Sequence, residues 1–281
     1  MANRRHSDAN SNGQGGGQGD NHPSAIWASG AAYEQYIGRW SRLVAREFLA
    51  WLAVPPGARW LDLGCGTGAL TQTILAVAEP QAVTGVDASA GVIASVRERT
   101  PDPRARFAVA DARATGEATG AYDAAVSGLV LNFVPEPERA AAEMARVTRA
   151  GGTVAAYVWD YAGRMELLRY FWDAATALDP AAADEGPRFA LATADALHDL
   201  FAGAGLGAVE TRAIEITMRF RDFADFWAPF LGGEGPAPRY VVALDAVRQA
   251  ALREALRARL PIAADGTIAL GARAWAVRGT H

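Results

Sequence analysis

The residues of this chain best suited to chemistry lie in the stretch WLDLGCGTG, at positions 60–68. Three alternating glycines, Gly64, Gly66 and Gly68, follow a strand-like apolar run and precede a helical pattern. Glycine permits positive φ angles and lets a ligand approach the backbone closely, and the first turn of a helix offers unpaired N–H groups. The stretch therefore predicts a nucleotide-sized cradle at the carboxyl end of a strand, where open α/β sheets bind ligands.

Two classes of cofactor compete for such a cradle. Dinucleotide-binding proteins use the wider spacing G-x-G-x-x-G, which seats a pyrophosphate on the helix N-terminus. Here the spacing is G-x-G-x-G, and Asp62 lies two residues before the first glycine. An acid there would repel a pyrophosphate but would suit a ligand that bears an ammonium group. The alternative for Asp62 is a cap on local backbone N–H groups.

Two further acids follow predicted strands. Asp87 ends the run VTGVD, 19 residues after Gly68. A carboxylate there can accept both hydroxyls of a ribose, a geometry that dinucleotide enzymes share; its alternative role is to cap the helix that begins near Ser89. Asp111 ends the next run, FAVAD. The alternative to a ligand-binding role for this residue is that of an ordinary loop aspartate.

With these residues the chain resembles the class I S-adenosylmethionine-dependent methyltransferases, whose first motif is an acid followed by G-x-G-x-G. The resemblance covers about residues 31–159 and is to small-molecule enzymes of the ubiquinone and menaquinone biosynthesis type. It implies S-adenosylmethionine as cofactor, its adenine amino group read near Asp111, and residues 127–133 as the floor below the sulfonium. Cys65 would contribute mainly a backbone contact. The cofactor-binding residues that it implies are Asp62, Gly64, Cys65, Gly66, Gly68, Asp87, Ala88, Asp111, Ala112, Ser127, Tyr36 and Arg39.

Tyr36 and Arg39 enter this set because of their place on the N-terminal helix. Members of the family often fold such a helix over the cofactor, where an arginine or a tyrosine could meet its carboxylate. The alternative is a core aromatic residue and a solvated arginine.

No catalytic residue is assigned, and four residues are weak candidates. Many relatives carry a histidine just past the fourth strand, where this chain has Asn132, so a histidine base is missing there. Asp160 and Tyr161 follow the fifth strand on the ligand side of the sheet and could contact a substrate or form a loop turn. His198, the one histidine far from either chain end, lies in a helical pattern expected to pack on the sheet edge.

Strand-like and helical patterns alternate strictly over about a hundred residues, which is typical of βαβ units and a parallel sheet covered on both faces. We expect an α/β Rossmann-like three-layer sandwich, with a seven-stranded, mostly parallel sheet, an antiparallel last strand and helical lid insertions. The predicted strands are 59–63, 82–86, 105–109, 121–127, 152–159, 207–220 and 266–278. The predicted helices are 31–52, 69–77, 90–99, 136–149, 165–178, 192–204 and 240–260.

The domain organisation follows from composition. Residues 1–24 are rich in Gly, Asn, Gln and Ser and are expected to be a disordered tail. Residues 25–281 are expected to form a single methyltransferase domain, with an N-terminal helical cap at 31–56 and a cofactor-binding core at 57–160. The predicted substrate-side insertions are 161–190 and 221–265; the second holds aromatic residues and then glycines, which is typical of a lid or of a dimer interface.

Composition excludes several classes of function. All 27 basic residues are arginine, so neither a Schiff-base lysine nor a Walker lysine is available. One cysteine and four histidines make a metal centre improbable. The net charge of −4 and the absence of a basic stripe disfavour nucleic acid. We find no membrane span and no secretory signal, and so expect a cytoplasmic monomer or homodimer.

These observations predict transfer of a methyl group from S-adenosylmethionine to oxygen or carbon of a small, apolar or aromatic acceptor. The displacement is in line and the donor is already activated, so the protein mainly aligns the reactants and excludes water. The alternatives are an NAD(P)-dependent oxidoreductase and a non-methylating protein that keeps the methyltransferase fold.

Overall fold

The computed structural model describes residues 34–233 and 235–281, so the predicted tail at 1–24 and the first residues of the predicted cap lie outside it. Seven strands form one sheet: β1 (Arg59–Leu63), β2 (Ala82–Asp87), β3 (Ala105–Val109), β4 (Tyr122–Gly128), β5 (Thr148–Trp159), β6 (Gly207–Phe220) and β7 (Ile268–Thr280).

The strand order in the sheet is β3-β2-β1-β4-β5-β7-β6. Strands β1 to β5 pair in parallel, and β7 is antiparallel to both of its neighbours, β5 and β6. The prediction of a mostly parallel sheet with an antiparallel last strand is confirmed.

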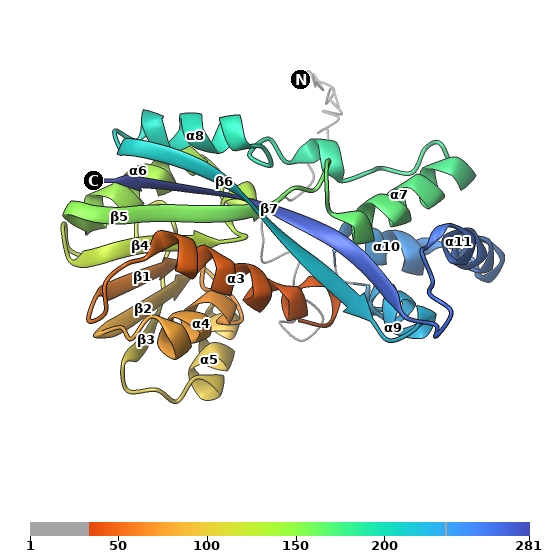
Figure 1. Cartoon of the computed structure of the whole chain (residues 1–281), viewed down its shortest axis with the longest axis horizontal. Coiled ribbons are helices and arrows are strands. Elements are labelled where there is room, and N and C mark those ends of the chain that lie inside the picture. The colour runs from red at the N-terminus through yellow and green to blue at the C-terminus, as the bar shows by residue number, and fades with distance from the viewer. Residues whose placement is uncertain (1–33, 234) are drawn as a thin grey trace, which may run out of the picture.

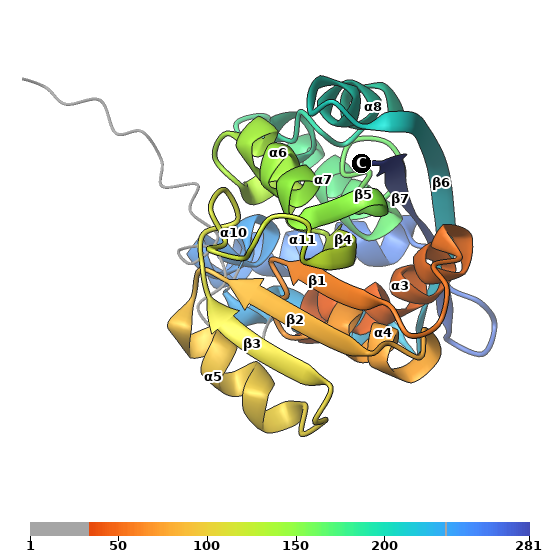
Figure 2. The ribbon, with the colours of Figure 1, turned by 90° about the vertical axis from the view of Figure 1, so that its left-hand side faces the viewer.

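Helices cover both faces of this sheet (Figure 2). On one face lie α3 (Arg39–Leu52), which the short π-helix η1 (Glu34–Gly38) precedes, α4 (Ala69–Val77) and α5 (Ala90–Arg99). On the other face lie α6 (Pro137–Val147) and α8 (Ala194–Gly203). The strands alternate accordingly: Trp60 packs into the first core and Leu61 into the second. The predicted three-layer arrangement is confirmed.

Capping residues set the ends of several helices. The Ser89 hydroxyl accepts the N–H of Val92 at 3.4 Å and begins α5, and Thr193 accepts the N–H of Ala196 at 3.2 Å and begins α8. The prediction of one helix over 240–260 is wrong. The chain forms α10 (Pro236–Ala243) and α11 (Ala246–Arg259) instead, because the Asp245 carboxylate accepts the N–H of Arg248 at 2.8 Å and starts a new helix.

Helical segments gather beyond the carboxyl end of the sheet (Figure 1). The residues of β7 before Ala274 no longer pair with β5 and continue with β6 past the end of β5, with one isolated bridge from Ala272 to Met165. We call residues 161–190 and 221–260 the aromatic region. Besides α10 and α11, it contains α7 (Glu166–Leu178), η3 (Gly186–Arg188), α9 (Phe223–Trp227) and η4 (Ala228–Gly232). Within the described part of the chain, no helix is both long and apolar enough to cross a membrane.

Candidate functional site

A pocket opens at the carboxyl ends of β1, β2 and β4, and it holds about 1370 Å³ of space with its open mouth included. Its lining contains eight of the residues that the sequence predicts to bind a cofactor: Asp62, Gly64, Cys65, Gly66, Asp87, Ala88, Asp111 and Ala112. The end of the parallel strands is where such sheets bind ligands, because the strand-to-helix loops leave room there.

The glycine loop takes a conformation that other residues would adopt only under strain. Gly64 has φ +75°, and a Cβ atom at that position would lie 2.5 Å from Cγ1 of Val130. Gly68 precedes α4 with φ +90°, and a Cβ there would lie 2.6 Å from Cγ2 of Val96. Gly68 lies outside the pocket lining, so its contribution is to turn the backbone into α4.

Asp62 presents a buried carboxylate to the pocket. Its side chain is 1% exposed, and the Thr71 hydroxyl donates a hydrogen bond of 2.6 Å to Oδ2. Oδ1 has no hydrogen-bond partner among the described residues. Burial raises the pKa of Asp62 to about 7, the bond from Thr71 opposes the rise, and the Asp87 carboxylate adds to it. A buried, half-satisfied carboxylate fits an ammonium group, which would supply the missing donor.

Asp87 holds the glycine loop to the end of β2. Its Oδ2 accepts the N–H of Gly66 at 3.1 Å and its Oδ1 accepts the N–H of Ser89 at 2.9 Å. Each carboxylate oxygen keeps a second acceptor position, so the side chain can still accept the hydroxyls of a ribose. The helix cap itself is Ser89, not Asp87.

Asp111 is engaged in an ion pair at the rim of the pocket. Arg113 donates to both of its oxygens, at 3.0 Å from Nε and 2.7 Å from Nη2, and also reaches Glu136 at 2.8 Å. These bonds lower the pKa of Asp111 to about 2. Arg113 lines the pocket as well, so the adenine end of the predicted site presents a guanidinium beside the carboxylate.

Cys65 lines the pocket and is buried, with 5% of the residue exposed. Burial raises the pKa of its thiol well above the ordinary value, so the group stays protonated at neutral pH. The backbone N–H groups of Gly64 and Cys65 both donate to the carbonyl of Val86, at 2.8 and 2.9 Å, and so fix the loop against β2.

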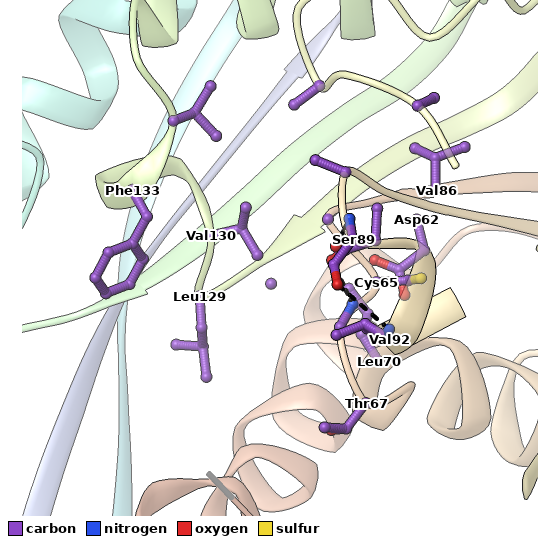
Figure 3. Close-up of a pocket in the computed structure, with 18 of the residues that line it drawn as sticks. Asp62, Cys65, Thr67, Leu70, Val86, Ser89, Val92, Leu129, Val130 and Phe133 are labelled. Atoms are coloured by element: carbon purple, nitrogen blue, oxygen red, sulfur yellow. Dashed lines mark hydrogen bonds between the residues drawn. The ribbon is translucent and has the colours of Figure 1, made fainter. Parts of the chain in front are cut away.

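An apolar wall faces the polar cradle. Leu129, Val130 and Phe133 lie across the pocket from Asp62 and Ser89 (Figure 3). These three belong to the segment predicted as the floor. This side of the pocket is therefore apolar, whereas the side formed by the glycine loop and Asp62 is polar.

Ser127, predicted to bind the cofactor, lies outside the pocket lining. It is fully buried, and its hydroxyl donates to the carbonyl of Leu63 at 2.8 Å. The serine therefore joins β4 to β1.

Tyr36 and Arg39, predicted to meet the carboxylate of the cofactor, lie at the N-terminal helix. Neither lines the pocket, and both pack against the aromatic region. Tyr36 is 2% exposed with its ring 5.5 Å from that of Phe230. The Arg39 guanidinium pairs with Asp225 at 2.9 Å and stacks on Phe220 at 4.9 Å. The N-terminal helix fixes the aromatic region here rather than presenting these side chains to the pocket.

None of the four weak catalytic candidates lines the pocket. Arg273 holds Asp160 through two bonds of 2.8 and 2.6 Å, so this carboxylate is committed to β7. His198 lies on α8 with half of its side chain exposed, away from the carboxyl ends of the strands. Asp160 also accepts the N–H of Gly163 at 2.8 Å, so the alternative of a loop turn holds there, and His198 lies on a helix as expected.

The other two candidates lie nearer to the pocket. Asn132 is adjacent to the lining residue Phe133, and its amide N and O have no partner among the described residues. Tyr161 is 5% exposed and stacks on Phe189 at 4.2 Å.

Sequence reasoning missed Thr71 and Arg113. Thr71 lies nine residues after Asp62 on the first turns of α4, where a hydroxyl on the inner face can reach back to β1. Arg113 follows Asp111 by two residues, a spacing at which an aspartate also accepts the backbone N–H of the second residue. Both signals are present in the sequence but are too common to stand out.

A family profile described as a methyltransferase domain matches residues 61–156. A trans-aconitate 2-methyltransferase of Variovorax paradoxus (strain S110) is 36% identical over 126 residues, which make up 44% of this chain and 47% of that protein. A demethylmenaquinone methyltransferase of Renibacterium salmoninarum is 36% identical over 119 residues, 41% and 45% of the two chains. The chain thus spans about half the length of the curated relatives that it matches.

A solved structure shares the fold. Phosphoethanolamine N-methyltransferase 2 of Haemonchus contortus, in complex with phosphomonomethylethanolamine and S-adenosylhomocysteine, matches with a TM-score of 0.55 at 16% identity. The match covers 92% of this chain and 58% of that one. At this identity the likeness concerns the fold alone.

Proposed function

We propose that this chain is a class I S-adenosylmethionine-dependent methyltransferase and that it methylates oxygen or carbon of a small, apolar or aromatic acceptor. The observation that carries the proposal is the buried Asp62 carboxylate, whose Oδ1 lacks a partner beside a glycine loop in the pocket. An amino acid-bearing nucleoside would satisfy that oxygen through its ammonium group.

The cradle residues divide the binding of S-adenosylmethionine among them. Asp62 would hold the ammonium group, and Asp87 the ribose hydroxyls. Gly64 and Gly66 would let the ligand approach the backbone. Asp111 and Arg113 would bound the adenine end, and their existing ion pair leaves the acid little freedom to turn.

The apolar wall would serve the transfer itself. When bound, the cofactor supplies an activated methyl group on a sulfonium, and a neutral thioether leaves. The side chains of Leu129, Val130 and Phe133 would exclude water and hold an apolar acceptor in line with the methyl group. The lining offers no histidine or lysine, which favours an acceptor that is acidic or enolisable on its own, such as a phenol or a 1,3-dicarbonyl compound.

The first test is a calorimetric titration with S-adenosylhomocysteine. We expect micromolar binding by the wild-type protein, a loss of at least about tenfold in affinity for Asp87→Ala, and no change for Asp199→Ala. Asp199 is the matched control because its carboxylate is exposed on α8. A folded wild-type protein that does not bind S-adenosylhomocysteine would overturn the cofactor assignment.

The second test measures transfer. The protein is incubated with methyl-labelled S-adenosylmethionine and a panel of phenols and 1,3-dicarbonyl compounds, and the label in the extracted acceptors is counted. Transfer that Asp87→Ala abolishes would support the proposed reaction. Tight cofactor binding without transfer to any member of the panel would refute the proposed acceptor class while leaving the cofactor assignment intact.

A further inference from the structure

Three charged residues form a bridge at the rim of the pocket. Asp111 and Arg113 line the pocket on the loop after β3, and Glu136 directly precedes α6, the helix that follows β4. The Arg113 guanidinium donates from Nη2 to Oδ2 of Asp111 at 2.7 Å and from Nη1 to Oε2 of Glu136 at 2.8 Å. One arginine therefore connects two loops whose strands, β3 and β4, are separated in the sheet by β2 and β1.

The Asp111 carboxylate is held by Arg113 but is not saturated with hydrogen bonds. Its Oδ1 accepts the backbone N–H and the Nε–H of Arg113 at 2.8 and 3.0 Å. Its Oδ2 accepts Nη2 at 2.7 Å and shares the Nε–H at 3.3 Å. A carboxylate offers about four acceptor positions, so these donors leave a position open on Oδ2. The side chain is 48% exposed and lines the pocket, so a ligand can reach that position.

The bonds from Arg113 also keep this carboxylate charged. They lower the pKa of Asp111 to about 2, and the side-chain bond is the largest cause. A charged acceptor forms a stronger hydrogen bond than a neutral one. It therefore favours a ligand group that donates over a group that only accepts. The 6-amino group at the adenine end of S-adenosylmethionine is such a donor.

Glu136 anchors the bridge on the other loop. Its φ is +54°, in the left-handed region that residues with a side chain seldom adopt. A glycine would adopt this conformation without strain, but it could not reach Arg113. Arg139 on α6 donates to the same carboxylate at 3.2 Å, from outside the pocket lining. The Arg113 guanidinium is thus held from two sides, and Asp111 cannot turn away without breaking its bonds to that group.

We propose that Arg113 is a positioning residue for the adenine ring: supported by Glu136, it holds the open acceptor position of Asp111 toward the 6-amino group. The inference rests on the proposed function, which it deepens, because it assigns the preference for a 6-amino purine over a 6-oxo purine to this bridge. A 6-oxo group only accepts hydrogen bonds, so it would face the Asp111 carboxylate without a donor. Arg113 acts through Asp111 and needs no contact with the ligand.

The test compares S-adenosylhomocysteine with S-inosylhomocysteine, which carries a 6-oxo group in place of the 6-amino group. Each ligand is titrated calorimetrically into the protein at pH 7.5. We expect the wild-type protein to prefer S-adenosylhomocysteine by at least about tenfold, the effect of one hydrogen bond to a charged group. The two ligands share the amino acid and the ribose, so the contributions of Asp62 and Asp87 cancel in the ratio of affinities.

Two variants remove the bridge from opposite ends. Arg113→Met keeps the aliphatic stem but removes the guanidinium, and we expect the preference to fall to about threefold or less, mainly through weaker binding of S-adenosylhomocysteine. Glu136→Asn removes the anchor, because asparagine is shorter and uncharged, yet it tolerates the left-handed conformation. We expect this variant to keep its thermal stability and to lose at least about half of the preference.

The matched control is Arg139→Met. This arginine contacts the same Glu136 carboxylate but lies outside the pocket lining, so the preference should stay at the wild-type value. The ratio also separates positioning from a structural role. If Arg113 only held the two loops together, its removal would weaken both ligands by the same factor and leave the ratio unchanged.

Three results would overturn the inference: equal wild-type affinity for the two ligands, an unchanged ratio in folded Arg113→Met, or an equally large fall in Arg139→Met. Thermal unfolding shows whether each variant is folded. If Arg113→Met does not fold, the ratio measured for Glu136→Asn decides in its place. A folded wild-type protein that binds neither ligand would refute the proposed function, and this inference with it, which is a result distinct from binding without preference.

Discussion

The pocket at the ends of the parallel strands and the aromatic region each contain one buried carboxylate with a single side-chain donor. In the pocket, Thr71 donates to Asp62 at 2.6 Å, and in the aromatic region, Trp172 donates to Glu185 at 3.1 Å. Burial raises the pKa of both carboxylates to about 7. The two regions thus share one electrostatic feature, a carboxylate that burial makes harder to ionise.

The two sites differ in how the chain assembles them. Asp62, its donor Thr71 and the glycine loop lie within ten residues of one another, on one strand-loop-helix unit. Glu185 takes its donor from α7, 13 residues before it, and lies near Tyr36 of η1, which is far away in the sequence. The first site therefore depends on local backbone geometry, and the second depends on long-range packing. Substitutions can test this difference.

The largest effect is expected from the removal of a ring in the aromatic region. Phe230 is fully buried and contacts four other aromatic rings, so Phe230→Ala should lower the free energy of unfolding by about 3–5 kcal/mol. Denaturant unfolding measures this change. The control is Leu231→Ala at an exposed position, expected within about 0.5 kcal/mol of wild type. In folded Phe230→Ala protein, S-adenosylhomocysteine affinity should stay within about threefold; a larger loss would show that the two regions are coupled.

The next largest effect is expected in the glycine loop. Gly64→Ala places a Cβ 2.5 Å from Val130 at φ +75°, whereas Gly116→Ala has the same φ with no atom within 4 Å. Both should lose about 1–2 kcal/mol of stability because of the backbone conformation. Because of the clash, Gly64→Ala should lose about 1–3 kcal/mol of stability more than Gly116→Ala. It should also bind S-adenosylhomocysteine measurably more weakly than the wild-type protein. Equal losses for the two variants would show that the close approach to Val130 does not matter.

The Asp62 carboxylate should make cofactor binding depend on pH. Its raised pKa of about 7 means that the free protein holds a neutral carboxyl below pH 7, whereas a bound ammonium group favours the charged form. Affinity for S-adenosylhomocysteine should therefore fall with decreasing pH, by about tenfold per unit below pH 7, and level off above it. Calorimetry at pH 5.5 to 8.5 measures this. Asp62→Asn should abolish the dependence, and Thr71→Val should move its midpoint to higher pH; a flat wild-type profile would contradict the assignment.

The smallest effect is expected for Arg39, which connects the N-terminal helix with the aromatic region. The Arg39–Asp225 pair is partly exposed, so Arg39→Ala should cost about 1 kcal/mol of stability, with a contribution from its stacking on Phe220. S-adenosylhomocysteine affinity should be unchanged, because the side chain lies outside the pocket lining. A loss of affinity above about threefold would restore the sequence-based expectation that Arg39 contacts the cofactor.

Local signals account for the parts of the molecule that were predicted correctly. The predicted ranges 69–77 and 90–99 coincide with α4 and α5, because glycine and serine mark their beginnings clearly. Eight of the predicted cofactor residues line one pocket for a similar reason: each lies at or just beyond the carboxyl end of a strand, and parallel strands end at the same edge of the sheet. Where a local signal was overlooked, as with the cap at Asp245, the helix prediction failed.

Side-chain partners that are distant in the sequence account for the errors. Asp160 follows a strand as a ligand-binding acid would, yet Arg273, which lies 113 residues away, holds it. Ser127 lies in the segment expected at the floor, yet it points into the core toward Leu63. Spacing along one segment contains no information about which distant side chain will meet it.

The sequence by itself determined the layered arrangement, the parallel strands of the sheet and the glycine cradle, because strand alternation and glycine conformation are local properties. Only the tertiary structure decided which carboxylates remain without a counter-charge. Burial and pairing depend on segments from across the chain, and they left Oδ1 of Asp62 without a partner among the described residues while arginines took Asp111, Asp160 and Asp184. The charge available to a ligand is a property of the folded whole, since it is set by the neighbours that folding brings together.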